Sequence, residues 1–222
     1  MTIEQAYLSF INSVERNMTN DGFSADKDRF VLIFNSAQIK FMKWIFKKGN
    51  TDDRRSIQRF VVNNCRMEKV GTTKNSTNFS IPSDFLHFLN LDAVASNKEC
   101  GNISMNLWEA KHENTHELLH DEFNAPSFDY RETFYTIGED EVKVYTDNFD
   151  IQECLITYYR YPKKVDMEGY TKEDGTLSSN VDPEFSDDSI EKILDICAKD
   201  FAKNEQNFTK YQVENQEIIT DF

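Results

Sequence analysis

Apolar residues recur with the period of an α-helix in three stretches before residue 68. Thr2 and Gln5 have capping-box spacing at the start of the first stretch, and Thr51 can cap the third. The second stretch ends at "KKGN", where Lys in the last turn and a following Gly are typical of a helix C-terminus. The repeating positions are Ile3, Tyr7, Phe10, Ile11, Val14 and Met18; Phe30, Ile33, Phe34, Ala37, Phe41, Trp44 and Ile45; and Ile57, Phe60, Val61 and Cys65. We therefore expect long, aromatic-rich helices in residues 1–68.

The pattern changes after residue 68. The stretch "KVGTTKNSTNFSIPSDF" is polar and rich in turn residues, and Ser83 can cap a short helix through "DFLHFL". From about Leu91 to Met167, runs of β-branched and aromatic residues separated by Gly, Asn and Asp predict strands. The alternation of Val142 and Val144 fits a half-buried antiparallel strand, and "GEDE" before it fits a hairpin loop. A short helix over 111–123 is expected between two of these strands.

A polar, acidic linker is predicted over residues 169–183. Ser186 can cap a last helix, in which Ile190, Ile193, Leu194, Cys197 and Phe201 follow helical spacing. We expect this helix to pack on the N-terminal helices. The predicted fold class is α+β, with N-terminal long helices and a C-terminal helix forming a bundle and an inserted antiparallel β-sheet or sandwich. The expected parts are a helical bundle (1–68 and 184–206), a β-rich module (69–168), the linker (169–183) and a C-terminal tail (207–222).

Charge and composition narrow the class of protein. The net charge of −14 argues against binding of the nucleic-acid phosphate backbone, which requires clustered Lys and Arg. No apolar run reaches the length of a membrane span, and the N-terminus lacks the pattern of a signal peptide. The four Cys are far apart in the sequence, so we expect reduced and mostly buried thiols.

The stretch "KHENTHELLH" contains the string His-Glu-x-x-His, formed by His112, Glu113 and His116. In zinc peptidases such a string places two His one helical turn apart, with the Glu activating a water molecule. His120 cannot complete the site, because on a straight helix it lies about 12 Å from His112. On a helical wheel His112, His116, Leu119, His120 and Phe123 share one sector, which predicts a packed helix face. We expect no metal, no cofactor and no catalytic residue here, and a contact between subunits is the alternative role.

Four stretches give the chain a family resemblance: "RFVLIFNSAQIKFMKW", "FSIPSDFLHFLNL", "DYRETFYTIGEDEVKVYTDNFDIQECLITYYRYPKKVDM" and "DPEFSDDSIEKILDICAKDF". Together they resemble the head–tail connector, or neck ring, proteins of crAss-like tailed bacteriophages, most strongly over residues 26–45, 80–90 and 127–201. The resemblance implies a virion protein made in the bacterial cytoplasm, which forms a ring, often twelvefold, under the portal. Its partners would be other copies of itself, the portal and adjacent ring or tail proteins. None of the three His belongs to the residues that carry the resemblance.

The composition fits such a role. An acidic channel wall would let DNA pass without specific binding, and head-to-tail surfaces would close a ring. In the C-terminal tail, Phe208, Tyr211, Ile218 and Ile219 are expected to order on a partner. Two alternatives stay open: a zinc-dependent hydrolase using the His-Glu-x-x-His string, and an acidic adaptor that binds a protein partner outside any virion.

Overall fold

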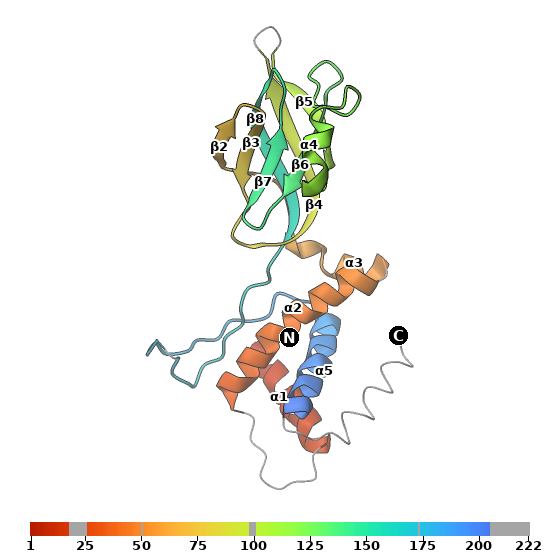
Figure 1. Cartoon of the computed structure of the whole chain (residues 1–222). Helices are drawn as coiled ribbons and strands as arrows, with labels where there is room; N and C mark the ends of the chain where they lie inside the picture. The colour runs from red at the N-terminus through yellow and green to blue at the C-terminus, as the bar shows by residue number, and fades with distance from the viewer. Residues whose placement is uncertain (18–25, 50, 98–100, 173, 205–222) are drawn as a thin grey trace. The chain divides into compact units, whose positions relative to one another are not determined.

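The computed structural model describes residues 1–17, 26–49, 51–97, 101–172 and 174–204. Within them the chain divides into two compact units, one formed by residues 1–59 and 162–204 and the other by residues 60–161. We call them the helical unit and the β unit. The α+β class is confirmed (Figure 1).

The helical unit contains most of the helical residues. Its helices are α1 (Ile3–Asn17), α2 (Lys27–Lys48), α3 (Thr51–Ser56), the 3-10 turn η1 (Gln58–Phe60), which runs into the β unit, and α5 (Asp187–Asn204). The capping box of α1 forms as expected, because the Thr2 amide donates to Gln5 Oε1 (3.0 Å) and the Gln5 amide donates to Thr2 Oγ1 (3.3 Å). The expected bundle of long N-terminal helices is not shown, because α1 has 15 residues and α3 only 6.

Aromatic rings join α1, α2 and α5 in the core of the helical unit. Phe10 of α1 lies 5.1 Å from Phe30 of α2 and 5.8 Å from Phe201 of α5, measured between ring centroids. At the surface, Lys40 Nζ donates to Asp200 Oδ2 over 2.7 Å. The last helix thus packs against the first two.

The predicted linker over 169–183 is a folded loop instead. Isolated bridges pair Asp166 with Val181 and Thr171 with Leu177. Polar contacts tie the loop to the helices, since Lys27 Nζ donates to the Glu168 carbonyl oxygen and the Ile3 amide donates to Asp182 Oδ1, both over 2.9 Å. The loop is therefore part of the helical unit.

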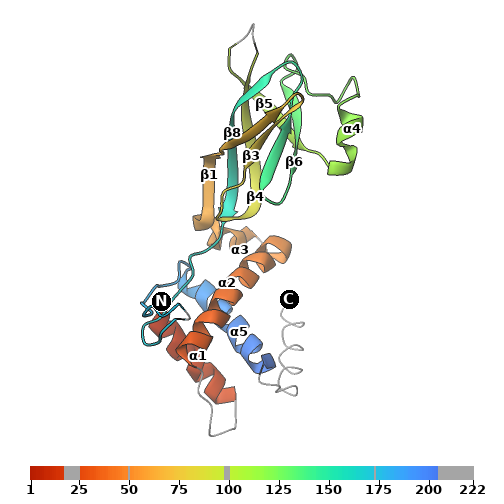
Figure 2. The same ribbon diagram turned by 60° about the vertical axis from the view of Figure 1, so that its left-hand side comes forward.

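The β unit is one curled, mixed sheet of eight strands in the order β1-β8-β4-β5-β6-β7-β3-β2 (Figure 2). The strands are β1 (Val61–Arg66), β2 (Lys69–Thr73), β3 (Ser76–Ser80), β4 (Phe85–Ser96), β5 (Ile103–Glu109), β6 (Glu132–Ile137), β7 (Glu141–Tyr145) and β8 (Asp150–Arg160). The predicted hairpin of β6 and β7 is confirmed, with Val142 and Val144 fully buried. Val61 pairs with Tyr159, so the chain enters and leaves this unit side by side.

Three predictions fail in the β unit. The sheet is not purely antiparallel, because β5 and β6 run parallel with Asn106 opposite Glu132. The third helix stops at Ser56, and Val61 to Arg66 form a strand that pairs with β8. The stretch "DFLHFL" is the start of β4 and not a short helix, because it also pairs with β8. In the last two cases long-range strand pairing outweighs local helical spacing.

Candidate functional site

The connection from β5 to β6 forms the candidate site. Parallel strands cannot be joined by a tight turn, so the chain must cross over between them. The crossing contains the 3-10 turn η2 (His112–Asn114) and the short helix α4 (Thr115–Leu118); Figure 1 labels α4. Leu118 and Leu119 pack against a small buried cluster of Ala110, Phe134 and Tyr145. The helix was expected over 111–123, but α4 is only four residues long, and Leu118 and Leu119 at its C-terminal end are the residues that pack on this cluster.

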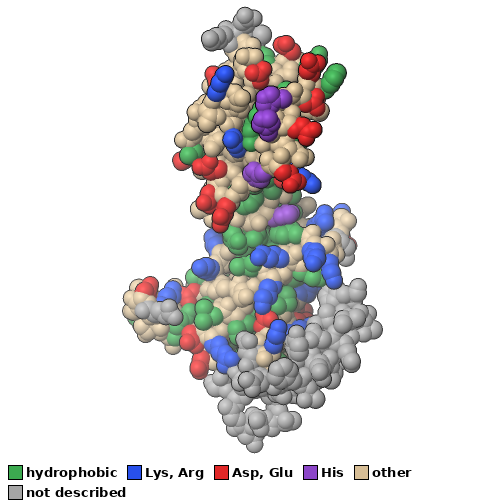
Figure 3. Space-filling view, viewed as in Figure 1, with side chains coloured by type: hydrophobic (Ala, Val, Ile, Leu, Met, Phe, Trp, Pro, Cys, Tyr) green, Lys and Arg blue, Asp and Glu red, His purple; other side chains and the backbone are tan. Residues whose placement is uncertain are grey.

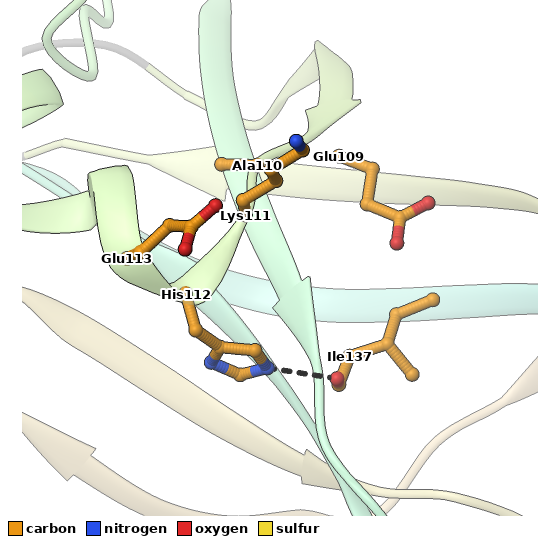
Figure 4. Close-up of a pocket in the computed structure, with 6 residues that line it drawn as sticks. All are labelled: Glu109, Ala110, Lys111, His112, Glu113 and Ile137. Carbon is orange, nitrogen blue, oxygen red and sulfur yellow. Dashed lines mark hydrogen bonds between the residues drawn. The ribbon is translucent and has the colours of Figure 1, made fainter.

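The histidine string does not lie on one continuous helix. His112 belongs to η2, and its Nε2 donates to the carbonyl oxygen of Ile137 over 3.0 Å (Figure 4). His116 belongs to α4, and its ring stacks on that of His120 with centroids 4.6 Å apart. His120 Nδ1 in turn donates to the His116 carbonyl oxygen over 2.8 Å. Each ring thus has its own contact. Within the described residues, no group of three or more His, Cys, Asp and Glu side chains is placed to hold a metal ion.

The predicted packed helix face is wrong for most of its members. His112, His116 and His120 are exposed, and Phe123 is 92% exposed; only Leu119 is partly buried. The helical wheel fails because α4 ends at Leu118, so Phe123 no longer shares a face with His112.

Beyond α4, residues 119–131 form a loop with its own hydrogen bonds. Asp121 Oδ1 accepts from the Phe123 amide over 3.0 Å and its Oδ2 accepts from Asn124 Nδ2 over 2.6 Å. These two bonds, the first above all, hold the pKa of the Asp121 carboxyl below its usual value. Phe128 anchors the far end against Phe149, with ring centroids 5.9 Å apart. The loop is therefore held at both ends.

This loop holds two aromatic side chains in solvent. Phe123 is 92% exposed and Tyr130 is 81% exposed. The Tyr130 amide donates to Ser127 Oγ over 3.3 Å, which fixes the backbone next to the ring. Aromatic side chains on an ordered loop are suited to protein contact, because they bury a large area at a small entropic cost. The sequence offers only one signal for them, a Phe and a Tyr set among acidic and turn residues.

An open hollow of about 750 Å³ lies beside η2 (Figure 4). It is lined by Glu109, Ala110, Lys111, His112, Glu113 and Ile137. Burial and the nearby charge of Glu109 raise the pKa of Tyr135, on the neighbouring strand, to about 12. The lining thus has two Glu carboxylates against one Lys amine, and its net negative charge favours a cationic side chain.

Acidic residues dominate the whole crossing. Residues 109–132 contain seven Asp or Glu and two Lys or Arg. In Figure 3, Asp, Glu and His side chains gather over the side of the β unit that carries α4. We call residues 109–132 the acidic aromatic surface.

The structure does not describe the other predicted site residues. Phe208, Tyr211, Ile218 and Ile219 fall outside the described residues. Comparison of the chain with protein-family models and with curated proteins gave no match. Among the described helices, none is both long and apolar enough to cross a membrane.

Proposed function

We propose that the chain is a structural virion protein that forms a ring in the head–tail connector of a tailed bacteriophage, between portal and tail. The observation that carries this proposal is the ordered loop that holds Phe123 and Tyr130 in solvent. Burying one such ring against a partner stabilises a complex by about 2 kcal/mol. The geometry thus favours contact between proteins as the task of this surface.

The resemblance to connector proteins gives the proposal its specific form. A connector subunit needs contacts to its neighbours in the ring and to the rings above and below. Two compact units, one helical and one built on a curled sheet, supply separate surfaces for these contacts. The bundle of long helices that the apolar pattern predicts belongs to this proposal, with α1, α2 and α5 as its described members.

The acidic balance of the chain supports a place beside the DNA channel. A net charge of −14 repels the phosphate backbone, so DNA would pass without adhering. The tail residues Phe208, Tyr211, Ile218 and Ile219 are proposed to anchor the subunit on the portal or a neighbouring ring.

The composition of purified particles tests the proposal. Isotope-labelled reference peptides from this chain and from the portal protein would be used to count both in virions. We expect the chain in a fixed ratio to the portal subunit, with the same whole number of copies in every particle, as a closed ring requires. Its absence from washed particles would contradict the proposal and favour the adaptor that acts outside the virion.

A further inference from the structure

A second charged surface, of opposite sign, lies on the helical unit. Residues 40–59 contain seven Lys or Arg and two Asp or Glu, the reverse of the count in residues 109–132. Both acids are already paired, because Arg55 Nη1 lies 3.1 Å from Asp52 Oδ1 and Lys192 Nζ lies 3.2 Å from Asp53 Oδ1. In Figure 3, Lys and Arg side chains gather over α2 and α3. We call the described residues of this stretch, 40–49 and 51–59, the basic surface.

The basic surface combines exposed amines with an aromatic ring. Lys43, Phe46 and Lys47 share one face of α2, because they are three and four residues apart. Both Lys are exposed and Phe46 is half-buried between them. Within the described part of the chain, neither Lys makes an ion pair. Lys47 also complements the helix dipole in the last turn, but Lys43 lies one turn earlier, where the dipole gives no reason for a cation.

The acidic aromatic surface has the matching features. Glu113 and Glu117 are exposed and, within the described residues, make no ion pair. Phe123 projects from the loop that follows α4, and the hollow beside Glu113 is open to an incoming side chain. An exposed ring on an acidic segment fits a half-buried ring between two exposed amines.

We propose that the acidic aromatic surface of one copy binds the basic surface of α2 and α3 on a second copy. The inference rests on the proposed ring and names the contact that would build it. The two surfaces differ, so the contact is heterologous, and repetition of such a contact closes a ring when the rotation per subunit allows it. Phe123 packs on the face that carries Phe46, and Lys43 or Lys47 reaches the carboxylates at the hollow.

Cross-linking between copies tests the pairing directly. Equal amounts of isotopically heavy and light full-length chain are mixed at low salt and treated with a carbodiimide, which joins amines to carboxylates without a spacer. We expect mixed-isotope peptides that join Lys43, Lys47 or Lys48 to carboxylates of residues 109–132. Absence of such peptides at the highest soluble concentration, or links mainly between other surfaces, would overturn the proposal.

Charge reversal provides a second test, in which mixing two variants should restore the self-association that each has lost. The variants Lys43→Glu/Lys47→Glu and Glu113→Lys/Glu117→Lys should each weaken self-association at least tenfold, as measured by sedimentation. An equimolar mixture of the two should recover it, because each variant then meets an oppositely charged surface. Lys74→Glu and Glu139→Lys, which reverse exposed charges elsewhere on the β unit, serve as matched controls. Association unchanged by the two reversals, or a mixture that does not recover, would contradict the pairing.

The remaining outcomes separate this inference from the proposed function. If the chain is counted in particles while the reversed variants assemble as the wild type does, the pairing is wrong and the connector role stands. If the charges pair but particles lack the chain, the connector role is wrong and the pairing stands. A third outcome would overturn the pairing and assign the basic surface to DNA. In it, the chain binds a DNA duplex of about 30 base pairs, Lys43→Glu/Lys47→Glu abolishes that binding, and no cross-links form between copies.

Discussion

Asp166 shows at the residue scale how the loop between β8 and α5 is fixed. Its Oδ1 accepts from the Tyr170 hydroxyl over 2.6 Å and from the Met167 amide over 2.9 Å. Its Oδ2 accepts from Lys172 Nζ over 2.7 Å and from the Ser179 amide over 3.2 Å. Burial alone would raise the pKa of this carboxyl, but the bonds, led by that from Lys172, lower it to about 2. The charged form is therefore the one that the fold stabilises.

The substitution Asp166→Asn should lower the free energy of unfolding by about 2 kcal/mol at neutral pH, because it removes the charge that four donors share. The folded-state pKa lies below the unfolded value, so this stability is present above about pH 4 and is lost as the pH falls towards 2. The difference between variant and wild type should shrink over the same interval. The free energy of unfolding is measured by urea unfolding followed by Trp44 fluorescence. The variants carry Trp108→Phe, so that Trp44 is the one Trp in the chain.

Asp195→Asn is the matched control for this substitution. Asp195 is exposed on α5, so its replacement should change the free energy of unfolding by less than about 0.5 kcal/mol. An Asp166→Asn variant that is as stable as this control at neutral pH would show that the bonds of Asp166 contribute nothing net.

At the scale of elements, the sequence predicts what local spacing decides. The capping box, the apolar positions of α2 and α5 and the β6–β7 hairpin follow from neighbouring residues. The stretch from Val61 to Arg66 satisfies helical spacing as well as strand propensity, and only its pairing with the distant β8 decides between them. The parallel pairing of β5 with β6 was not predicted, because the apolar pattern of a strand does not decide which strand it pairs with or in which direction.

The same limit applies to the candidate site. The histidine spacing predicted one continuous helix, but packing of Leu118 and Leu119 on the sheet ends α4 early. Exposure of Phe123 follows from that early end, so no periodicity in the sequence could have predicted it. The acidic charge of the region, in contrast, can be counted directly.

Asn35 joins two elements of the helical unit. Its Nδ2 donates to the Val165 carbonyl oxygen over 3.0 Å, and its Oδ1 accepts from the Val165 amide over 2.8 Å. Asn35→Ala should lower the free energy of unfolding by about 2 kcal/mol, because the amide and the carbonyl of the buried Val165 both lose this partner. Hydrogen exchange should show faster exchange of the Val165 amide, with the exposed Asn12→Ala as control. An unchanged exchange rate at Val165 would contradict this view of the loop.

At the scale of the whole molecule, the β unit is an insertion with paired ends. Val61 lies opposite Tyr159, and a core that includes Phe79, Tyr135 and Ile151 is formed by residues of this unit alone. A chain segment with its own core and adjacent ends has the properties of an independent folding unit.

Residues 60–161 should therefore fold when produced alone. We expect a single cooperative urea transition, reported by Trp108, which lies 5.4 Å from Phe134 between ring centroids. A fragment with no cooperative transition would show that the β unit depends on the rest of the chain.

We propose that copies of this chain form a ring on a portal. Electron cryo-microscopy of the full chain mixed with the portal protein of the same virion tests this most directly. The account predicts a closed ring of density on one end of the portal, with residues 109–132 of each copy against α2 and α3 of the next. Portals that carry no additional density, while the chain stays dispersed as monomers, would contradict it.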